Sequence, residues 1–241
     1  LGGDHGEGLG DHGEDEHGFF VYDTTIRAPL IFKYPGRIRA GVRTRKFVRN
    51  VDIMPTIAEL AGIDAPHPID GRSLAPIFRD EDFVETPIYS EAFSGYFHYG
   101  WSPVRSIRTA QWKFVEAPRR ELYDVTKDPG EMTNLYNSED RVAERLEKIM
   151  AKHLRDESAV TPLESDPGAI SAEQKSRLAA LGYISSGRKM QDSFEGLPDP
   201  KDEVIQFIGR QTAKYHTALG MMAIEANDPS KAEDEFARAL E

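Results

Sequence analysis

Short apolar runs separated by turn residues fill the first two thirds of the chain. Four of these runs have the composition of β-strands, and short turns join them, so we expect an antiparallel meander. They cover residues 87–90, 104–108, 112–115 and 121–124. An earlier apolar run, Ala28 to Tyr34, predicts a buried strand of a mainly parallel sheet. The combination predicts an α/β fold with a small antiparallel sheet subdomain.

Helical spacing of apolar positions predicts two amphipathic helices in the same region. Residues 51–60 place Ile57 and Leu60 on one face, and Gly62 follows as a C-terminal cap. Residues 142–154 repeat apolar positions at the same spacing. We therefore expect the first domain to cover residues 1–155.

The last third of the chain has a different pattern. Pro and Gly punctuate residues 156–200, which predicts a linker holding one short helix at 172–181. Residues 201–241 have helical character apart from a break at 227–229. Small residues such as Gly220 would let two antiparallel helices pack closely. This part is therefore predicted to be a helical hairpin.

Charge and composition exclude several classes of function. The formal net charge is −11, which disfavours a general nucleic-acid or anionic-membrane surface. No cysteine is present, so disulfides, zinc–thiolate sites and a cysteine nucleophile are excluded within these residues. No apolar run approaches the ~18 residues of a membrane span. The first residues already belong to a Gly-rich motif, and we expect the chain to be part of a longer protein.

That motif holds the candidate chemistry. Asp4 and His5 stand between glycines, which allow the tight backbone needed to aim a carboxylate oxygen and an imidazole nitrogen at one cation. A third group, His17, follows after the Gly-rich residues 6–16. Asp4 and His5 are therefore candidate metal ligands, whereas His17 could contact an anion or a second metal.

These residues resemble the C-terminal half of a known family, the sulfatases of the alkaline phosphatase superfamily. Sulfatases commonly have Ser-Asp-His-Gly-Glu, Leu-Gly-Glu-His-Gly, a Lys or His, and Arg-Val-Pro-Leu-Ile in this order. The matching blocks here are Asp4-His5-Gly6-Glu7, Leu9-Gly10-Asp11-His12-Gly13, His17, Tyr22, Arg27-Ala28-Pro29-Leu30-Ile31, Val51-Asp52-Ile53-Met54-Pro55-Thr56-Ile57, Asp70-Gly71-Arg72-Ser73-Leu74 and Glu121-Leu122-Tyr123-Asp124. Residues 201–241 are similar to a partial tetratricopeptide repeat.

The resemblance implies the roles of the site residues. Asp4 and His5 would bind a divalent cation, calcium by family habit, with Mg, Mn or Zn as alternatives. His17 stands where many sulfatases carry a Lys that contacts the sulfate. The nucleophile, a formylglycine made from Cys or Ser, would lie in the N-terminal half. No Cys-X-Pro-X-Arg or Ser-X-Pro-X-Arg pattern occurs in these 241 residues.

The resemblance implies a sulfate-ester hydrolase in the periplasm or outside the cell, acting on a sulfate-ester substrate. Two alternatives stay open. One is a phosphodiesterase or phosphoethanolamine transferase of the same superfamily, and the other is a non-catalytic tetratricopeptide-type protein whose helices recruit a protein partner. Neither nucleic acid nor a membrane span is expected.

Other polar residues of the motif have two interpretations. The acidic residues are expected to be solvated charges whose field could help hold a cation nearby, and they are Glu7, Asp11, Glu14, Asp15 and Glu16. His12 is expected to make a structural hydrogen bond or to bind metal. Arg27 would either pair with a carboxylate that supports the site or lie at a strand edge. The aromatic residues at 96–101 could line a pocket, although core packing is favoured.

Overall fold

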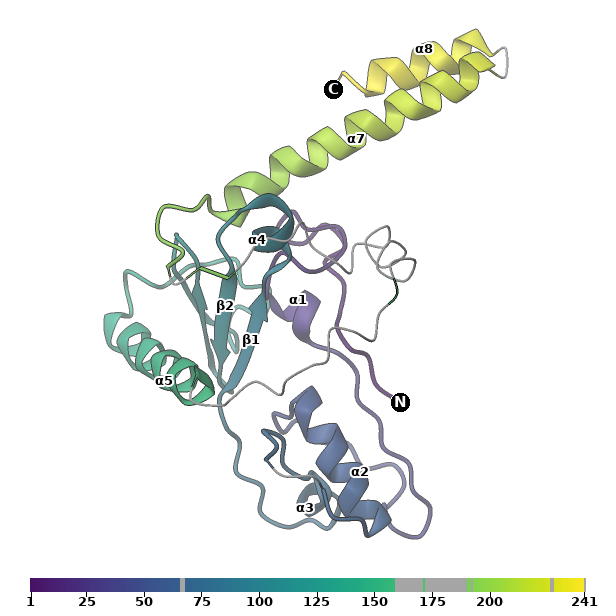
Figure 1. Cartoon of the computed structure of the whole chain (residues 1–241). Coiled ribbons are helices and arrows are strands. Elements are labelled where there is room, and N and C mark those ends of the chain that lie inside the picture. Colours follow the sequence, from purple (N-terminus) through teal and green to yellow (C-terminus); the bar gives the residue numbers. More distant parts are fainter. Residues whose placement is uncertain (66–67, 159–170, 172–189, 192, 226–227, 241) are drawn as a thin grey trace.

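The computed structural model describes residues 1–241 except 66–67, 159–170, 172–189, 192, 226–227 and 241. Figure 1 shows a central sheet with a helix along one side, a lobe of short helices at one end and a long helical hairpin projecting from the other. The short helix expected at 172–181 lies outside the described residues.

The sheet has four antiparallel strands in the order β1-β2-β3-β4, which confirms the predicted meander. Alternate side chains of a strand point to opposite faces, so the sheet has two separate apolar faces. One row of partners runs across all four strands through Tyr89, Ile107, Phe114 and Leu122. The strands are β1 Ile88–Ala92, β2 Val104–Arg108, β3 Trp112–Glu116 and β4 Glu121–Asp124.

Helix α5, Asp140–Ser158, covers the face that carries this row. Its apolar residues Ala143, Leu146 and Met150 are buried against Ile107, Phe114 and Leu122 of the sheet, whereas most of its charged residues are exposed. The predicted amphipathic helix is confirmed. It begins two residues earlier and ends four residues later than its apolar pattern, because its first and last residues pack no apolar side chain into this core.

The opposite face packs against the segment that follows the Gly-rich motif. Phe20, Val21 and Tyr22 are at most 4% exposed and form one cluster with residues of β2, β3 and β4. The short helix α1, Asp23–Ile26, continues directly from them. The motif is therefore anchored to the sheet at its C-terminal end by three consecutive buried residues.

The lower lobe contains η1 Asn50–Asp52, α2 Ile53–Ala61 and α3 Ala75–Phe78. Helix α2 ends at Gly62, whose φ of 71° is the left-handed cap expected from the sequence. The predicted buried face is wrong, because Ile57 is 55% exposed and Thr56 is fully buried. The Thr56 hydroxyl donates to Asp52 O and accepts from Leu74 N, so hydrogen bonds to the 70–74 loop decide which face turns inward.

The predicted strand at Ala28 to Tyr34 is also wrong. The structure has only an isolated antiparallel bridge between Gly2 and Leu30 in this segment, and Ile31 is 58% exposed. A strand needs a neighbour along its whole length to pair its backbone groups. Among the described residues only the first three of the chain pair with this segment, at residues 29–31, and therefore the rest of its apolar run joins no sheet.

Helices α7, Pro200–Glu225, and α8, Pro229–Arg238, form the projecting hairpin. A Cβ atom at Gly220 would lie 2.6 Å from the Phe236 ring, so the two helices approach as closely as the small residue allows. The expected close packing at this glycine is confirmed. The Asp228 side chain caps α8 by accepting a hydrogen bond from Lys231 N.

Helix α4, Ser94–Tyr99, carries most of the aromatic residues noted in the sequence. Tyr96 is fully buried and Trp101, just after the helix, is 4% exposed, which agrees with core packing for these two. Phe207 of α7 lies 4.8 Å from the Tyr99 ring and 5.6 Å from the Phe19 ring, between centroids. The first turns of α7 therefore pack on the aromatic group beside the Gly-rich motif.

Candidate active site

The Gly-rich motif folds back on itself, so that two limbs of one loop lie side by side. Backbone hydrogen bonds join Gly6 N to Thr25 O at 2.7 Å and Gly8 N to Glu16 O at 2.7 Å. A Cβ atom would lie 2.1 Å from Thr24 O at Gly6 and 2.1 Å from Glu14 O at Gly8. Only glycine fits such an approach of two backbones. The glycines thus bring the two ends of the motif side by side.

Asp4 and His5 project from the first limb of this loop. The Asp4 side chain is 91% exposed, and its Oδ1 lies 3.7 Å from Nε2 of His5. The His5 Nδ1 atom lies 2.7 Å from Gly6 O. Because a carbonyl oxygen can only accept, Nδ1 carries the hydrogen and Nε2 of the neutral ring keeps its lone pair. A carboxylate oxygen and an unprotonated nitrogen therefore stand together, which fits a divalent cation.

His17 reaches the same place from the second limb. Its ring stacks on the His5 ring with 3.6 Å between centroids, and its Nδ1 lies 2.6 Å from Oε1 of Glu7. His5, Glu7 and His17 each offer an atom within 4.8 Å of the others, and all three are exposed. The structure thus brings His5 and His17 together and adds Glu7, which the sequence pattern had suggested to be a solvated charge, whereas Asp4 lies against His5 and is not part of this group.

The Glu7 contact leaves two chemical states for His17. An ionised carboxylate only accepts, so Nδ1 of His17 donates to it. If Nε2 is also protonated, the ring is an imidazolium that can donate to a sulfate oxygen, as a Lys would. If Nε2 is unprotonated, it is a metal ligand oriented by a carboxylate. The same geometry therefore serves either a sulfate contact or a second cation.

His12 and Glu14 hold the loop in shape. His12 Nε2 lies 3.0 Å from Glu131 O, and the ring stacks on Tyr22 at 3.6 Å between centroids. Of its two interpretations, the structural hydrogen bond is the one observed. Glu14 is 2% exposed and accepts from Phe19 N and Phe20 N, so the expectation of a solvated charge is wrong. Burial raises the pKa of the Glu14 carboxyl to about 6, although these two hydrogen bonds oppose the rise.

A buried ion cluster lies behind the loop. Lys113 is fully buried, and its Nζ lies 3.1 Å from Asp23 Oδ1 and 2.7 Å from Glu131 Oε1. Arg108 also pairs with Asp23, at 3.2 Å. Burial works to raise the pKa of Asp23, but the charges and hydrogen bonds of Lys113 and Arg108 outweigh it and lower that pKa. Since Glu131 also accepts from Asp23 N, the cluster connects α1 to β2 and β3.

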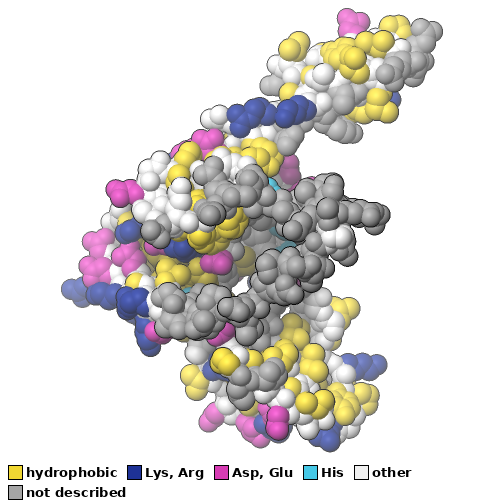
Figure 2. All heavy atoms as spheres, in the orientation of Figure 1, with side chains coloured by type: hydrophobic (Ala, Val, Ile, Leu, Met, Phe, Trp, Pro, Cys, Tyr) yellow, Lys and Arg dark blue, Asp and Glu magenta, His cyan; other side chains and the backbone are white. Residues whose placement is uncertain are grey.

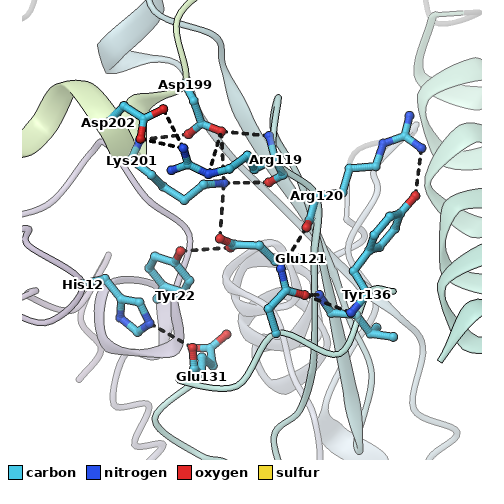
Figure 3. Close-up of polar contacts among 12 residues, drawn as sticks. His12, Tyr22, Arg119, Arg120, Glu121, Glu131, Tyr136, Asp199, Lys201 and Asp202 are labelled. Atoms are coloured by element: carbon cyan, nitrogen blue, oxygen red, sulfur yellow. Dashed lines mark hydrogen bonds and ion pairs between the residues drawn. The ribbon is translucent and has the colours of Figure 1, made fainter. Parts of the chain in front are cut away.

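A second polar group joins the loop region to α7 (Figure 3). The Tyr22 hydroxyl donates to Glu121 Oε2 at 2.9 Å, and burial followed by the Glu121 charge raises the pKa of Tyr22. Lys201 Nζ lies 3.3 Å from Glu121 Oε1, and Arg119 donates to both oxygens of Asp202. The start of α7 is therefore tied to β4 and, through Tyr22, to the motif.

Sequence patterns missed most of this support. Arg27, the suggested partner of a supporting carboxylate, is exposed, and no ion pair of Arg27 is seen among the described residues. Arg108 and Lys113 from the meander pair with Asp23 instead. One signal in the sequence could have indicated the buried pair. Lys113 is a charged residue within the apolar strand Trp-Lys-Phe-Val, and a Lys buried in such a strand needs a carboxylate partner.

Comparison with known proteins places this architecture in a class. The fold is similar to a structure of a protein in complex with its substrate D-glucosamine-2-N,6-O-disulfate, with a TM-score of 0.57 and 26% identity, over 68% of this chain and 35% of that chain. It is also similar to a phosphonate monoester hydrolase of Agrobacterium radiobacter, with a TM-score of 0.53 and 25% identity, over 64% of this chain and 34% of that one. The alkaline-phosphatase-like sulfatase fold agrees with these similarities.

The family follows from the sequence match. Residues 10–159 match the family described as N-sulphoglucosamine sulphohydrolase, C-terminal. The chain therefore belongs to the sulfatase family, through its C-terminal domain. It is 31% identical over 175 residues to N-acetylglucosamine-6-O-sulfatase of Bacteroides thetaiotaomicron, covering 68% of this chain and 30% of that protein. The chain thus spans about a third of the length of this relative.

The comparisons do not support a tetratricopeptide assignment, since the family match ends at residue 159. What the structure establishes for this part is a two-helix hairpin docked on the sulfatase domain. In the part of the chain that the structure describes, no helix is both long and apolar enough to cross a bilayer.

Proposed function

We propose that the full-length protein containing this chain hydrolyses sulfate esters with the help of a divalent cation held by Asp4 and His5. The observation that carries the proposal is one loop in which Asp4 Oδ1 lies 3.7 Å from His5 Nε2 and the His5 ring stacks on His17. Asp4 and His5 directly precede the residues that match the sulfatase family, and His17 lies within them. Sulfatases generally use a divalent metal, and the free Nε2 of His5 beside the Asp4 carboxylate suits one.

Each residue has a defined part in this proposal. The cation supplies Lewis-acid stabilisation of charge on the substrate oxygens. Asp4 offers a hard, charged oxygen, and His5 offers a nitrogen. His17, protonated on both nitrogens and held by Glu7, donates to a sulfate oxygen and fixes the ester. Calcium is proposed on the resemblance, with Mg, Mn and Zn as alternatives, of which Zn and Mn accept imidazole more readily.

We infer a sulfated sugar as the substrate class. Support comes from the relative named as an N-acetylglucosamine sulfatase and from the structural neighbour bound to a glucosamine disulfate. The nucleophile would be contributed by residues outside this chain. A periplasmic or extracellular location is part of the same proposal, because sulfated sugars of this kind are found outside the cytoplasm.

Turnover of a small aryl sulfate by the full-length protein tests the proposal. His17→Ala should lower kcat/KM by about two orders of magnitude, as expected for loss of a charge-assisted contact at the reacting group. His17→Lys should restore much of the loss, since it returns a donor cation. Glu16→Gln, an exposed neighbour, is the matched control and should leave turnover unchanged. Full activity of His17→Ala would contradict the role of His17.

A second candidate is hydrolysis of a phosphodiester or phosphonate ester, favoured by the similarity to phosphonate monoester hydrolase. In this case the unprotonated His17 state would bind metal. A phosphonate monoester should then be turned over faster than the aryl sulfate by the same preparation. The measured preference between the two esters decides between the candidates.

A third candidate is a non-catalytic binding role for the hairpin, through a partial tetratricopeptide repeat. The exposed apolar side chains Met221, Met222 and Ile224 are the feature that favours a protein partner there. This candidate requires that the full-length protein turns over neither ester.

A further inference from the structure

The solvent-facing side of α5 carries a regular row of basic residues. Arginine or lysine recurs at intervals of four, three, four and three residues, and every member is exposed. Figure 2 shows basic side chains gathered at the left edge of the molecule, over α5. The row, called the α5 basic stripe below, consists of Arg141, Arg145, Lys148, Lys152 and Arg155.

The geometry of the helix makes this a straight, narrow stripe. At 3.6 residues per turn the five Cα atoms fall within about 80° of the circumference, and at 1.5 Å per residue they extend over about 21 Å. The opposite side of the same helix holds the buried residues Ala143, Leu146 and Met150. Because that side is packed on the sheet, the helix cannot rotate and the stripe has a fixed orientation. Four of its members, Arg141, Arg145, Lys148 and Lys152, line one open depression together with Glu144 and Ile149.

Such a stripe is unexpected in a chain with a net charge of −11. One internal contact is weak, since Lys148 Nζ lies 3.8 Å from Glu144 Oε2 with both side chains largely exposed. Like charges at this spacing on a helix repel one another and cost stability. A bound polyanion would remove that cost and release counterions.

The surroundings of the stripe select among polyanions. The exposed carboxylates of Asp140 and Glu144 lie along one side of it and would repel the second strand of a nucleic-acid duplex, whereas Glu147 on the same side is paired with Arg120. No Phe, Tyr or Trp occurs in α5, and its His153 ring is packed against Tyr89, so bases of a single strand would have no ring of the stripe to stack on. The exposed face also lacks the large apolar side chains that insert into a lipid surface.

We propose that the α5 basic stripe binds the chain of a sulfated polysaccharide, at a site separate from the loop of Asp4, His5 and His17. The choice of ligand rests on the proposed function. A sulfated polysaccharide is a linear polyanion without bases or acyl chains, which fits a stripe one side chain wide. Binding there would hold a polymeric substrate on the enzyme between successive encounters with the active site, and this would raise the effective concentration of its sulfate esters at that site.

The test measures binding of heparin, a sulfated polysaccharide, to the 241-residue chain by titration calorimetry at about 50 and 200 mM salt. The variant combines Arg145→Gln, Lys148→Gln and Lys152→Gln, which keep good helix formers on a solvent-facing surface. The matched control combines Arg37→Gln, Arg43→Gln and Arg45→Gln, three exposed cations outside α5. Circular dichroism of both proteins verifies that the fold is retained.

We expect the α5 variant to bind heparin at least about tenfold more weakly at the lower salt. The slope of log K against log salt concentration should become shallower by about 2, because each lost contact to a single-stranded polyanion removes about 0.7 from it. The control should retain its affinity. The proposal is overturned if the chain does not bind heparin, or if the control loses as much affinity as the variant. Equal affinity for desulfated heparin, duplex DNA, single-stranded RNA or anionic vesicles also overturns it.

This test is separable from that of the proposed function, because binding needs no nucleophile and a small aryl sulfate cannot span the stripe. Aryl sulfate turnover without heparin binding would reject only the stripe. Heparin binding by a protein that hydrolyses no sulfate ester would reject only the sulfatase function.

Discussion

Nδ1 of His17 lies 2.6 Å from Oε1 of Glu7, although the two residues stand on opposite limbs of the Gly-rich loop. This contact decides what His17 can do. It occupies one ring nitrogen with a carboxylate and leaves Nε2 to act either as a donor or as a ligand, depending on whether it carries a proton. The metal and the sulfate roles of the loop therefore separate in experiments on individual residues.

Metal content should separate Asp4 from His17 in the full-length protein. Asp4→Ala removes a charged oxygen ligand and should deplete the purified protein of its cation. His17→Ala should retain the cation and lose turnover if His17 contacts the sulfate as we propose. Elemental analysis of both variants measures this. Equal loss of metal in the two would make His17 a ligand and favour the phosphatase-type alternative.

The Glu14 carboxyl should make stability depend on pH below neutrality. Its pKa is raised from 4.5 to about 6 in the folded chain, so the folded state binds more protons than the unfolded state between these values. The free energy of unfolding should therefore fall as the pH rises from about 4.5 to 6.5, by about 2 kcal/mol from this group.

Chemical denaturation of wild type and Glu14→Gln across this pH range measures the effect, since the amide cannot ionise and should show a smaller fall. The exposed Glu16→Gln is the control and should keep the wild-type slope. A Glu14→Gln protein with an unchanged slope would show that another group causes it.

Removal of Lys113 should be among the most destabilising single changes in the domain. Lys113→Met would leave the buried carboxylate of Glu131 without its cation and Asp23 with Arg108 alone, a loss of about 3–5 kcal/mol. Lys127→Met removes a cation that is 80% exposed and pairs with Asp124, so it should cost less than about 1 kcal/mol. Denaturant midpoints of the two variants give the comparison, and similar losses would rule out the buried cluster as a main support.

Two glycines of α7 should respond oppositely to alanine. At Gly209 a Cβ meets nothing within 4 Å, and alanine should stabilise the helix by up to about 1 kcal/mol. At Gly220 the same Cβ would lie 2.6 Å from the Phe236 ring, and alanine should push α8 away. Hydrogen exchange of the α8 amides reports this directly. Unchanged protection in Gly220→Ala would mean that the ring moves aside at little cost.

Local patterns were sufficient where a single element determines its own structure. The strands of the meander, helix α5, the cap at Gly62 and the close approach at Gly220 all follow from spacing or from a glycine with a specific steric role. The Asp4-His5-Gly6-Glu7 block and the blocks after it also identified the family, which the match over residues 10–159 confirms. In each case the information lies within a few neighbouring residues.

Only the tertiary structure decided how distant residues combine. The burial of Glu14 and Thr56, the pairing of Asp23 with Lys113 and Arg108, and the docking of α7 on the sulfatase domain depend on partners up to about 190 residues away in the chain. The segment from Ala28 to Tyr34 shows what happens without such a partner, since an apolar run becomes a strand only when a neighbour pairs with it. The sequence by itself determined most of the elements and the family, and it proposed the chemistry of the loop. Which charges are buried, and which partners neutralise them, was decided by packing, because the cost of burying a charge depends on what lies next to it.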